Sequence, residues 1–322
     1  NFTAGTTTVS MTVNKATPTI SSFSAITKTF GNADFALVAP TTNSTGAITY
    51  TSSNTAVATI AGSTVTIVSA GSSTITATQA TTANYLAGTI TATLTVNKIT
   101  TVLSGFSVAA KTFGDASFNL VNPTTNSNGA FTYTSSNTAV ATIVGNVVTI
   151  VGGGTATITA SQATTNNYLA ATTTASITVS QATPTITNFA AVTKEFGDAS
   201  FNIVNPTTNS TGAFTYTSSN TAVATVAGNV VTIVGLGTTT ITASQASTTN
   251  YISGTITATL QIIKGLPTFT AFSIPNKTIG NTSFIITPPT TNGDGNFTYT
   301  SSNLLVAKIV ENRIAIVGIG NS

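Results

Sequence analysis

The sequence predicts an all-β protein built from tandem sandwich domains. Three observations support this fold class: the chain repeats itself with an 83-residue period, apolar and polar residues alternate with a period of two, and turn-forming Gly, Pro and Asn separate the short alternating segments. Alternation with period two is typical of strands with one buried face, whereas an amphipathic helix has a period of 3.6. No segment shows a helical apolar stripe, so we expect strands and turns throughout.

The repeat defines the domain organisation. The block Tyr-Thr-Ser-Ser-Asn begins at Tyr50, Tyr133, Tyr216 and Tyr299, so successive copies are separated by the same 83-residue step. Self-similarity at a fixed period is the mark of a repeat array. We therefore predict three complete repeats, repeat 1 (16–98), repeat 2 (99–181) and repeat 3 (182–264), and an incomplete repeat 4 (265–322). Residues 1–15 match the closing strand of a preceding repeat. No initiator Met or signal-peptide core opens the chain at Asn1, so we expect either a mature product or a fragment.

Within a repeat, individual strands can be placed from the pattern. Residues 255–262 alternate apolar and polar side chains, as expected of a strand with one buried and one solvent-exposed face, and β-branched Thr suits the exposed face. Residues 222–234 predict two short strands joined at Gly228-Asn229, and Gly145-Asn146 marks the same hairpin in repeat 2. Aromatic residues recur at fixed positions and are expected in the core of each repeat. In repeat 3 these are Phe189, Phe196, Phe201, Phe214, Tyr216 and Tyr251.

The stretch from Tyr216 through Val226, followed by residues 228–237 and Ile241-Thr-Ala243, resembles the bacterial immunoglobulin-like group 2 repeats. These repeats form parts of invasin- and intimin-like adhesins and of giant secreted surface proteins. The resemblance implies tandem immunoglobulin-like β-sandwich domains with an exact 83-residue repeat, and it brings no catalytic or ligand-binding residue with it. Repeat 4 departs from the pattern at Leu304-Leu305, Lys308, Glu311 and Arg313.

The composition argues against several classes of function. Charged residues make up 5% of the chain and the net charge is +3, so no basic patch can neutralise a row of phosphates and we expect no nucleic acid partner. The chain has no Cys, and Thr, Ser, Asn and Gly interrupt every apolar stretch, so we expect neither disulfides nor a membrane span in this segment.

The residues needed for catalysis or metal binding are scarce. The chain has no His, and it has six acidic residues, with no repeat position acidic in more than two repeats. We therefore predict no catalytic, cofactor-binding or metal residue, no cofactor, and no enzyme activity. Asp115 and Asp198 share a slot that is Asn32 and Asn281 in the other repeats, and we interpret it as a turn residue that accepts hydrogen bonds from backbone amides.

Three further features have structural interpretations. Gly152, Gly153 and Gly154, like Gly235 and Gly237, resemble a phosphate loop, but no Gly-Lys-Ser/Thr follows, so they predict a turn. One lysine slot recurs in every repeat and is interpreted as a solvated charge that guards a strand edge; it is filled by Lys28, Lys111, Lys194 and Lys277. Asn-x-Ser/Thr triplets begin at Asn1, Asn43, Asn209, Asn276, Asn281 and Asn296 and arise readily by chance in so Thr-rich a chain.

These features predict a non-catalytic structural repeat segment of an extracellular surface protein, acting as an adhesin stalk or spacer. The alternative is a structural subunit of an extracellular filament or of a virion or phage fibre, assembled by strand complementation in which residues 1–15 of one copy complete repeat 4 of the next. The expected partners are neighbouring repeats, copies of the chain itself, and glycans on the Thr, Ser and Asn faces, since so little charge protects the sheets. Ice or polysaccharide binding by ordered threonines such as Thr255, Thr257 and Thr259 is a third possibility, which the twist of a sandwich sheet disfavours.

Overall fold

A computed structural model describes all 322 residues, which form strands and turns and no helix. It follows that no helix is long and apolar enough to cross a membrane. The chain divides into two compact units. Unit 1 consists of Asn1–Ala182 with Thr249–Tyr251, and unit 2 consists of Thr183–Thr248 with Ile252–Ser322. Residues 1–15 form no strand.

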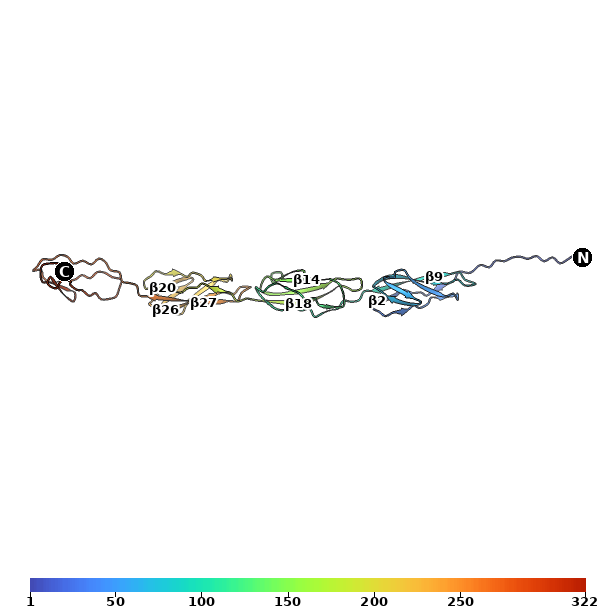
Figure 1. The fold of residues 1–322 in the computed structure, drawn as a ribbon, viewed down its shortest axis with the longest axis horizontal. Helices are drawn as coiled ribbons and strands as arrows, with labels where there is room; N and C mark the ends of the chain where they lie inside the picture. The colour runs from blue at the N-terminus through green and yellow to red at the C-terminus, as the bar shows by residue number, and fades with distance from the viewer. The chain divides into compact units, whose positions relative to one another are not determined.

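Repeat 1 is a sandwich of two main sheets. Its strands are β1 (Ile20–Ser21), β2 (Ile26–Thr29), β3 (Phe35–Ala36), β4 (Thr41–Thr42), β5 (Ile48–Ser52), β6 (Ala58–Ala61), β7 (Thr64–Ile67), β8 (Gly71–Gln79) and β9 (Gly88–Asn97). The four-stranded sheet has the order β2-β9-β8-β5 and the three-stranded sheet the order β3-β7-β6, with β1 and β4 as a separate short pair. Strands β2 and β9 lie side by side in Figure 1 and are parallel, while every other pair in the repeat is antiparallel.

Repeats 2 and 3 reproduce this topology. The strands of repeat 2 are β10 (Leu103–Ser104), β11 (Lys111–Thr112), β12 (Phe118–Asn119), β13 (Thr124–Thr125), β14 (Phe131–Ser135), β15 (Ala141–Val144), β16 (Val147–Ile150), β17 (Gly154–Gln162) and β18 (Ala171–Ser180). Those of repeat 3 are β19 (Ile186–Thr187), β20 (Val192–Glu195), β21 (Phe201–Asn202), β22 (Thr207–Thr208), β23 (Phe214–Ser218), β24 (Ala224–Ala227), β25 (Val230–Ile233), β26 (Gly237–Gln245) and β27 (Gly254–Ile263). The prediction of tandem immunoglobulin-like sandwiches is confirmed, and the predicted hairpin at 222–234 consists of β24 and β25 with Gly228 at φ 62°.

The core of each sandwich follows from the period-two pattern. In repeat 1, Ile75 of β8 and Leu94 of β9 are fully buried and pack with Val65 of the opposite sheet. Between them on the same strands, threonines such as Thr76 and Thr91 lie directly opposite each other on the outer face. Because successive side chains point to opposite faces of a strand, one alternating sequence supplies both the core and the hydroxyl-covered outer surface.

Each of repeats 1 to 3 contains a buried polar cluster that was not predicted from the sequence. Gln79, at 1% exposure, accepts a hydrogen bond from Thr42 Oγ1 through Oε1 (2.7 Å). Its Nε2 donates to the carbonyl oxygens of Ser44 (2.9 Å) and Gly46 (3.4 Å). Gln162 and Gln245 make the same three contacts in repeats 2 and 3. A buried amide must have its hydrogen bonds satisfied, so this side chain fixes the loop before β5 against the end of β8.

Repeat 4 contains three strands, β28 (Phe284–Ile285), β29 (Ala307–Val310) and β30 (Arg313–Ile316), in the order β28-β30-β29. They correspond to the three-stranded sheet of the other repeats. The two long strands that complete the core in repeats 1 to 3 correspond to positions from 320 onward, of which the chain holds three. Among residues 265–322 the apolar side chains of repeat 4 are covered by this one sheet, and we call their other side the open face.

Candidate functional site: the joint between repeats

The joint between repeats 1 and 2 lies entirely within unit 1 and is held by the backbone. Ile99, the first residue of repeat 2, forms a parallel bridge with Tyr168. The Ile99 N–H donates to the Asn167 carbonyl oxygen (2.9 Å), and the Leu169 N–H donates to the Ile99 carbonyl oxygen (3.0 Å). The loop before β18 is thus hydrogen-bonded to both the N–H and the carbonyl group of Ile99 in the connecting segment, and no free linker separates the two domains.

The last residue of repeat 1 is fixed by the same loop. The Lys98 ammonium donates to Thr164 Oγ1 (3.1 Å) and to the carbonyl oxygen of Thr165 (2.6 Å). A charged donor makes a stronger hydrogen bond than a neutral one, which favours this position of the lysine at the junction. Gln181 takes the equivalent position at the end of repeat 2.

Two side chains of repeat 2 reach back to the body of repeat 1. Asn167 Oδ1 accepts a hydrogen bond from the backbone N–H of Ala70 (2.9 Å), in the turn between β7 and β8. The Tyr168 ring meets Phe30 edge to face, with ring centroids 6.0 Å apart and an interplanar angle of 73°. An aromatic pair contributes about 0.5–1.5 kcal/mol beyond area burial, and a hydrogen bond about as much.

The same pair of contacts recurs one full repeat further along the chain, again within unit 1. Asn250 Oδ1 accepts a hydrogen bond from the Gly153 N–H (2.9 Å). The Tyr251 ring meets Phe113 edge to face, with centroids 5.4 Å apart and an angle of 78°. The recurrence of both contacts shows that the joint is encoded in the repeat.

This geometry corrects two of the predicted core residues. Tyr251 lies against Phe113 at a joint, outside the core of its own repeat, and Phe196 is 54% exposed. Phe196 occupies the same slot as Phe30 and Phe113, which is the slot that a joint tyrosine contacts in repeats 1 and 2. The sequence contained a clue: these phenylalanines precede a Gly-Asp or Gly-Asn turn and these tyrosines follow an Asn, which places both at the ends of the sandwich.

The shared acidic slot has the predicted structural role. Asp115 Oδ2 accepts a hydrogen bond from the Thr112 N–H (2.9 Å), and Asp198 Oδ2 accepts one from the Glu195 N–H (3.1 Å). Asn32 and Asn281 accept the same bond in repeats 1 and 4. All four side chains thus close the turn that follows the edge strand.

The recurring lysines do more than the predicted edge protection. Strands β2, β11 and β20 are edge strands, as expected for that role. In addition, each ammonium lies over a phenylalanine ring of the facing sheet, 4.6 Å from the centroid for Lys28 on Phe35 and 4.8 Å for Lys111 on Phe118. Lys194 and Lys277 are placed likewise at 5.3 and 5.0 Å. A cation–π contact at a partly exposed site contributes about 0.5–1 kcal/mol, so the lysine also ties the two sheets together at their edges.

The glycine-rich segments lie between strands. Gly152 and Gly153 separate β16 from β17, and Gly235 occupies the corresponding turn before β26. Because the Gly153 N–H is a donor in the second joint, this turn also takes part in the connection between repeats. Among the glycosylation triplets, Asn43 and Asn209 each accept a backbone hydrogen bond through Oδ1.

Two buried phenols distinguish repeats 2 and 3. Tyr133 donates a hydrogen bond to Asn122 Oδ1 (2.5 Å), and Tyr216 donates to Asn205 Oδ1 (2.7 Å). Burial raises the pKa of both hydroxyls because it disfavours the phenolate. In repeat 1 the position equivalent to Asn122 is Ala39, so this hydrogen bond has no counterpart there.

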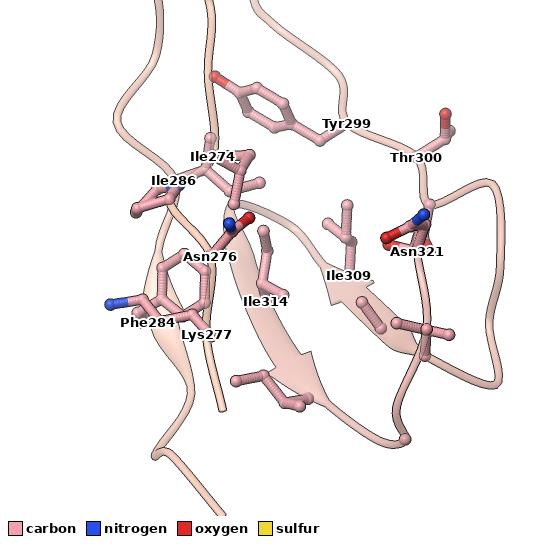
Figure 2. Close-up of a pocket in the computed structure, with 18 of the residues that line it drawn as sticks. Ile274, Asn276, Lys277, Phe284, Ile286, Tyr299, Thr300, Ile309, Ile314 and Asn321 are labelled. Carbon is pink, nitrogen blue, oxygen red and sulfur yellow. The ribbon is translucent and has the colours of Figure 1, made fainter. Parts of the chain in front are cut away.

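The open face of repeat 4 forms a cavity of about 830 Å³. Figure 2 shows isoleucines from several segments converging on it, among them Ile286, Ile309 and Ile314, with Tyr299 at one side. Ile286 and Ile314 are buried even so. The lining is that of a sandwich core, so we interpret this cavity as uncovered core and not as a small-molecule site.

Comparisons with known proteins identify no family. No protein-family model matches the chain, and no curated protein matches it. Among solved structures, Drosophila N-cadherin EC1-3 is 10% identical, with 76% of this chain and 100% of that chain covered and a TM-score of 0.32. The immunoglobulin domains 1–5 of Sidekick-1 are 11% identical, covering 94% and 75%, with a TM-score of 0.31. The insect immune protein hemolin is 12% identical, covering 95% and 93%, with a TM-score of 0.26.

Proposed function

We propose that this chain is a non-catalytic structural segment of an extracellular surface protein and acts as an adhesin stalk or spacer. The observation that carries the proposal is the joint. Its backbone bridge, lysine contacts, Asn–amide bond and Tyr–Phe pair restrict bending where two domains meet, as a spacer that holds a distal domain away from a surface requires. A chain built only to link domains flexibly would need none of these contacts.

The chemistry of the repeats supports the same role. The shared acidic slot closes a turn, the recurring lysines of repeats 1 to 3 lie at sheet edges, and Gly153 takes part in a joint, while the six acidic residues are spread among the repeats. The likeness of the Tyr216–Val226 segment to bacterial immunoglobulin-like group 2 repeats agrees with a spacer of a cell-surface protein. The proposal includes glycans on the hydroxyl-rich sheet faces, because charged residues are too few to prevent those faces from associating with other chains.

The spacer role is tested by changing the length of the array. The chain is placed between a membrane anchor and a binding domain on a cell, and one 83-residue period (99–181) or two periods are deleted. We expect capture of a ligand that sits behind a surface barrier to fall stepwise with each deletion, while binding of free ligand stays constant. Capture that is independent of array length would contradict the proposal.

A matched control separates length from stiffness. The Asn167→Ala/Tyr168→Ala chain keeps its full length but loses both contacts from repeat 2 to the body of repeat 1. It should capture less than the parent chain if the joint holds the array extended. A Thr172→Ala chain, changed on the outer face of β18, should behave as the parent.

A second candidate function is a self-assembling extracellular or virion fibre, and the apolar face of residues 1–15 favours it. Val9, Met11 and Val13 are 92%, 84% and 80% exposed and alternate along the segment. They align with Ala92, Leu94 and Val96 of β9, which are buried in repeat 1. Inserted into the open face of repeat 4 of a second copy, the segment would bury these side chains by strand addition. It supplies one of the two long strands, so the restored sheet would lack the counterpart of β8.

The fibre is tested by sedimentation and by a charge placed on the apolar face of residues 1–15. Residues 1–322 should sediment as oligomers, and Met11→Asp should return them to monomers because assembly would then bury a carboxylate. Ser10→Asp, on the opposite face of the segment, is the control and should still assemble. A chain of residues 1–322 that sediments as a monomer would exclude strand exchange in this form.

A further inference from the structure

The first and last main strands of each complete repeat are parallel neighbours, and this arrangement determines how a repeat responds to tension. The chain enters repeat 1 at Ala16, which bridges Tyr85 in parallel, passes through β2, and leaves after β9. Pulling on the two ends of the repeat therefore slides β2 along β9. All hydrogen bonds between the two strands carry the load together, whereas antiparallel terminal strands would open one bond at a time.

The length of this parallel pairing, which we call the terminal clamp, differs among the repeats. In repeat 1 it joins Ile26–Thr29 to residues 94–97, and in repeat 3 it joins Val192–Glu195 to residues 260–263. In repeat 2 it joins only Lys111–Thr112 to Val179 and Ser180. The clamp of repeat 2 is thus half as long as the other two.

The sequence explains the difference. Ile26 and Thr27 of repeat 1 correspond to Ala109 and Ala110 in repeat 2, where neither residue is in a strand. Ile26 packs against the core of repeat 1, whereas in repeat 2 the residue that packs against the core is Val108, one position earlier in the repeat. Repeats 1 and 3 have a β-branched residue at both positions, Ile26-Thr27 and Val192-Thr193, whereas alanine has a low strand propensity, so the strand of repeat 2 begins two residues later.

We propose that the sequence makes one repeat mechanically weaker than the others, and that repeat 2 is the first complete repeat to unfold under tension. Forced unfolding is governed by the unfolding rate, and the barrier along a pulling coordinate depends on the bonds that must break together. The short clamp presents fewer such bonds. The biological role of this weak repeat rests on the proposed stalk function. One unfolded repeat would release about 27–30 nm of extended chain and so lower the tension on its neighbours.

The experiment stretches the full chain between handles at its two ends at constant velocity. We expect three unfolding events of equal released length, one of which occurs at lower force than the other two. Because equal lengths do not identify a repeat, paired substitutions assign the events. Ala109→Ile with Ala110→Thr gives repeat 2 the residues of repeat 1 and should move the low-force event into the high-force group.

The reciprocal variant tests the same idea independently. Ile26→Ala with Thr27→Ala gives repeat 1 the residues of repeat 2 and should create a second low-force event. If the first variant fails to fold, this one alone decides. Thr132→Ala, on the edge strand β14 at the far side of the sheet from the clamp, is the control and should leave the force distribution unchanged.

Three events in one force group, or substitutions at 109 and 110 that leave the low-force event in place, would overturn the inference. Either result leaves the spacer proposal intact, since reach at low load does not depend on the order of unfolding. Conversely, capture that is independent of array length would contradict the stalk proposal, while the inferred order of unfolding would stand. Hydrogen exchange on each variant separates a change in equilibrium stability from a change in the clamp.

Discussion

Gly129→Ala tests whether the buried glutamine cluster holds each sandwich together. A Cβ at this position would lie 2.1 Å from the carbonyl oxygen of Ala163 and 3.3 Å from Cγ of Gln162. The first distance is impossible for a real contact, and the obstructing atom belongs to the backbone, so the loop before β14 must move away from the end of β17. That movement stretches the Gln162 Nε2 hydrogen bonds to Ser127 O (3.1 Å) and Gly129 O (2.9 Å).

The magnitude follows from what is lost. Leaving a buried polar group unsatisfied costs about 1–3 kcal/mol, and displacing the loop breaks a second hydrogen bond worth about 1 kcal/mol. We therefore expect Gly129→Ala to lower the free energy of unfolding of repeat 2 by roughly 2–4 kcal/mol, which is a large fraction of the stability of a domain of this size. Because a multidomain chain is not two-state, hydrogen exchange resolved by peptide is the appropriate measurement.

The chain contains its own control. Gly295 is the counterpart of Gly129 in repeat 4, and an added Cβ there meets no atom within 4 Å. Gly295→Ala should change the free energy of opening that hydrogen exchange reports for repeat 4 by less than about 0.5 kcal/mol, within the usual range of surface substitutions. Equal effects of the two substitutions, or a Gly129→Ala protein whose repeat 2 exchanges like the parent, would refute the role of the glutamine cluster.

Three further predictions concern the joint, the phenols and a hairpin. Asn167→Ala should increase exchange of the Ala70 amide at least several-fold while the centre of β8 stays protected, because only the acceptor at the joint is lost; an unchanged amide would show that the contact does not form in solution. The raised pKa values of Tyr133 and Tyr216 mean that the unfolded chain loses these protons first, so their contribution to stability is complete below the unfolded pKa of about 10 and is lost as pH rises through the folded value; denaturation curves from pH 9 upward with phenolate absorbance would check this, and stability that rises with pH would contradict it. Gly228→Ala should cost about 1–2 kcal/mol, because Gly228 has φ 62°, which places a Cβ too close to the following carbonyl; thermal unfolding that matches the parent would argue against that hairpin geometry.

The sequence was sufficient for the fold and for the strand pattern, because the period-two alternation is a direct consequence of burying one face of each strand. The alternating residues 255–262 lie in β27, where Leu260 and Ile262 are buried, and Gly228 lies in the hairpin turn. The recurrence of these features three times gave each inference independent support.

The joint and the glutamine cluster could not be obtained in the same way. A Tyr that packs on the preceding repeat and a Tyr that packs in its own core both recur at the 83-residue spacing, so Tyr251 and Tyr216 looked alike although one lies at a joint and the other is buried. Gln245 sits at the end of an alternating strand, where a polar residue normally marks a turn. Only the position of Ser210 and Gly212, brought close by the fold, gives its amide the acceptors that make burial possible.

Differences between repeats are more informative than their similarities once the fold is fixed. Pro18 faces Gly88 in repeat 1, and a Cβ on that glycine would lie 2.7 Å from the proline ring. In repeat 2 the two positions are Thr101 and Ala171, and the threonine hydroxyl instead donates to the Leu169 carbonyl oxygen, next to the joint. The same repeat carries the short clamp. In repeat 2, therefore, the first segment is held by an additional hydrogen bond while the terminal strands share a shorter pairing. Tension on this repeat should break the clamp before it breaks the joint.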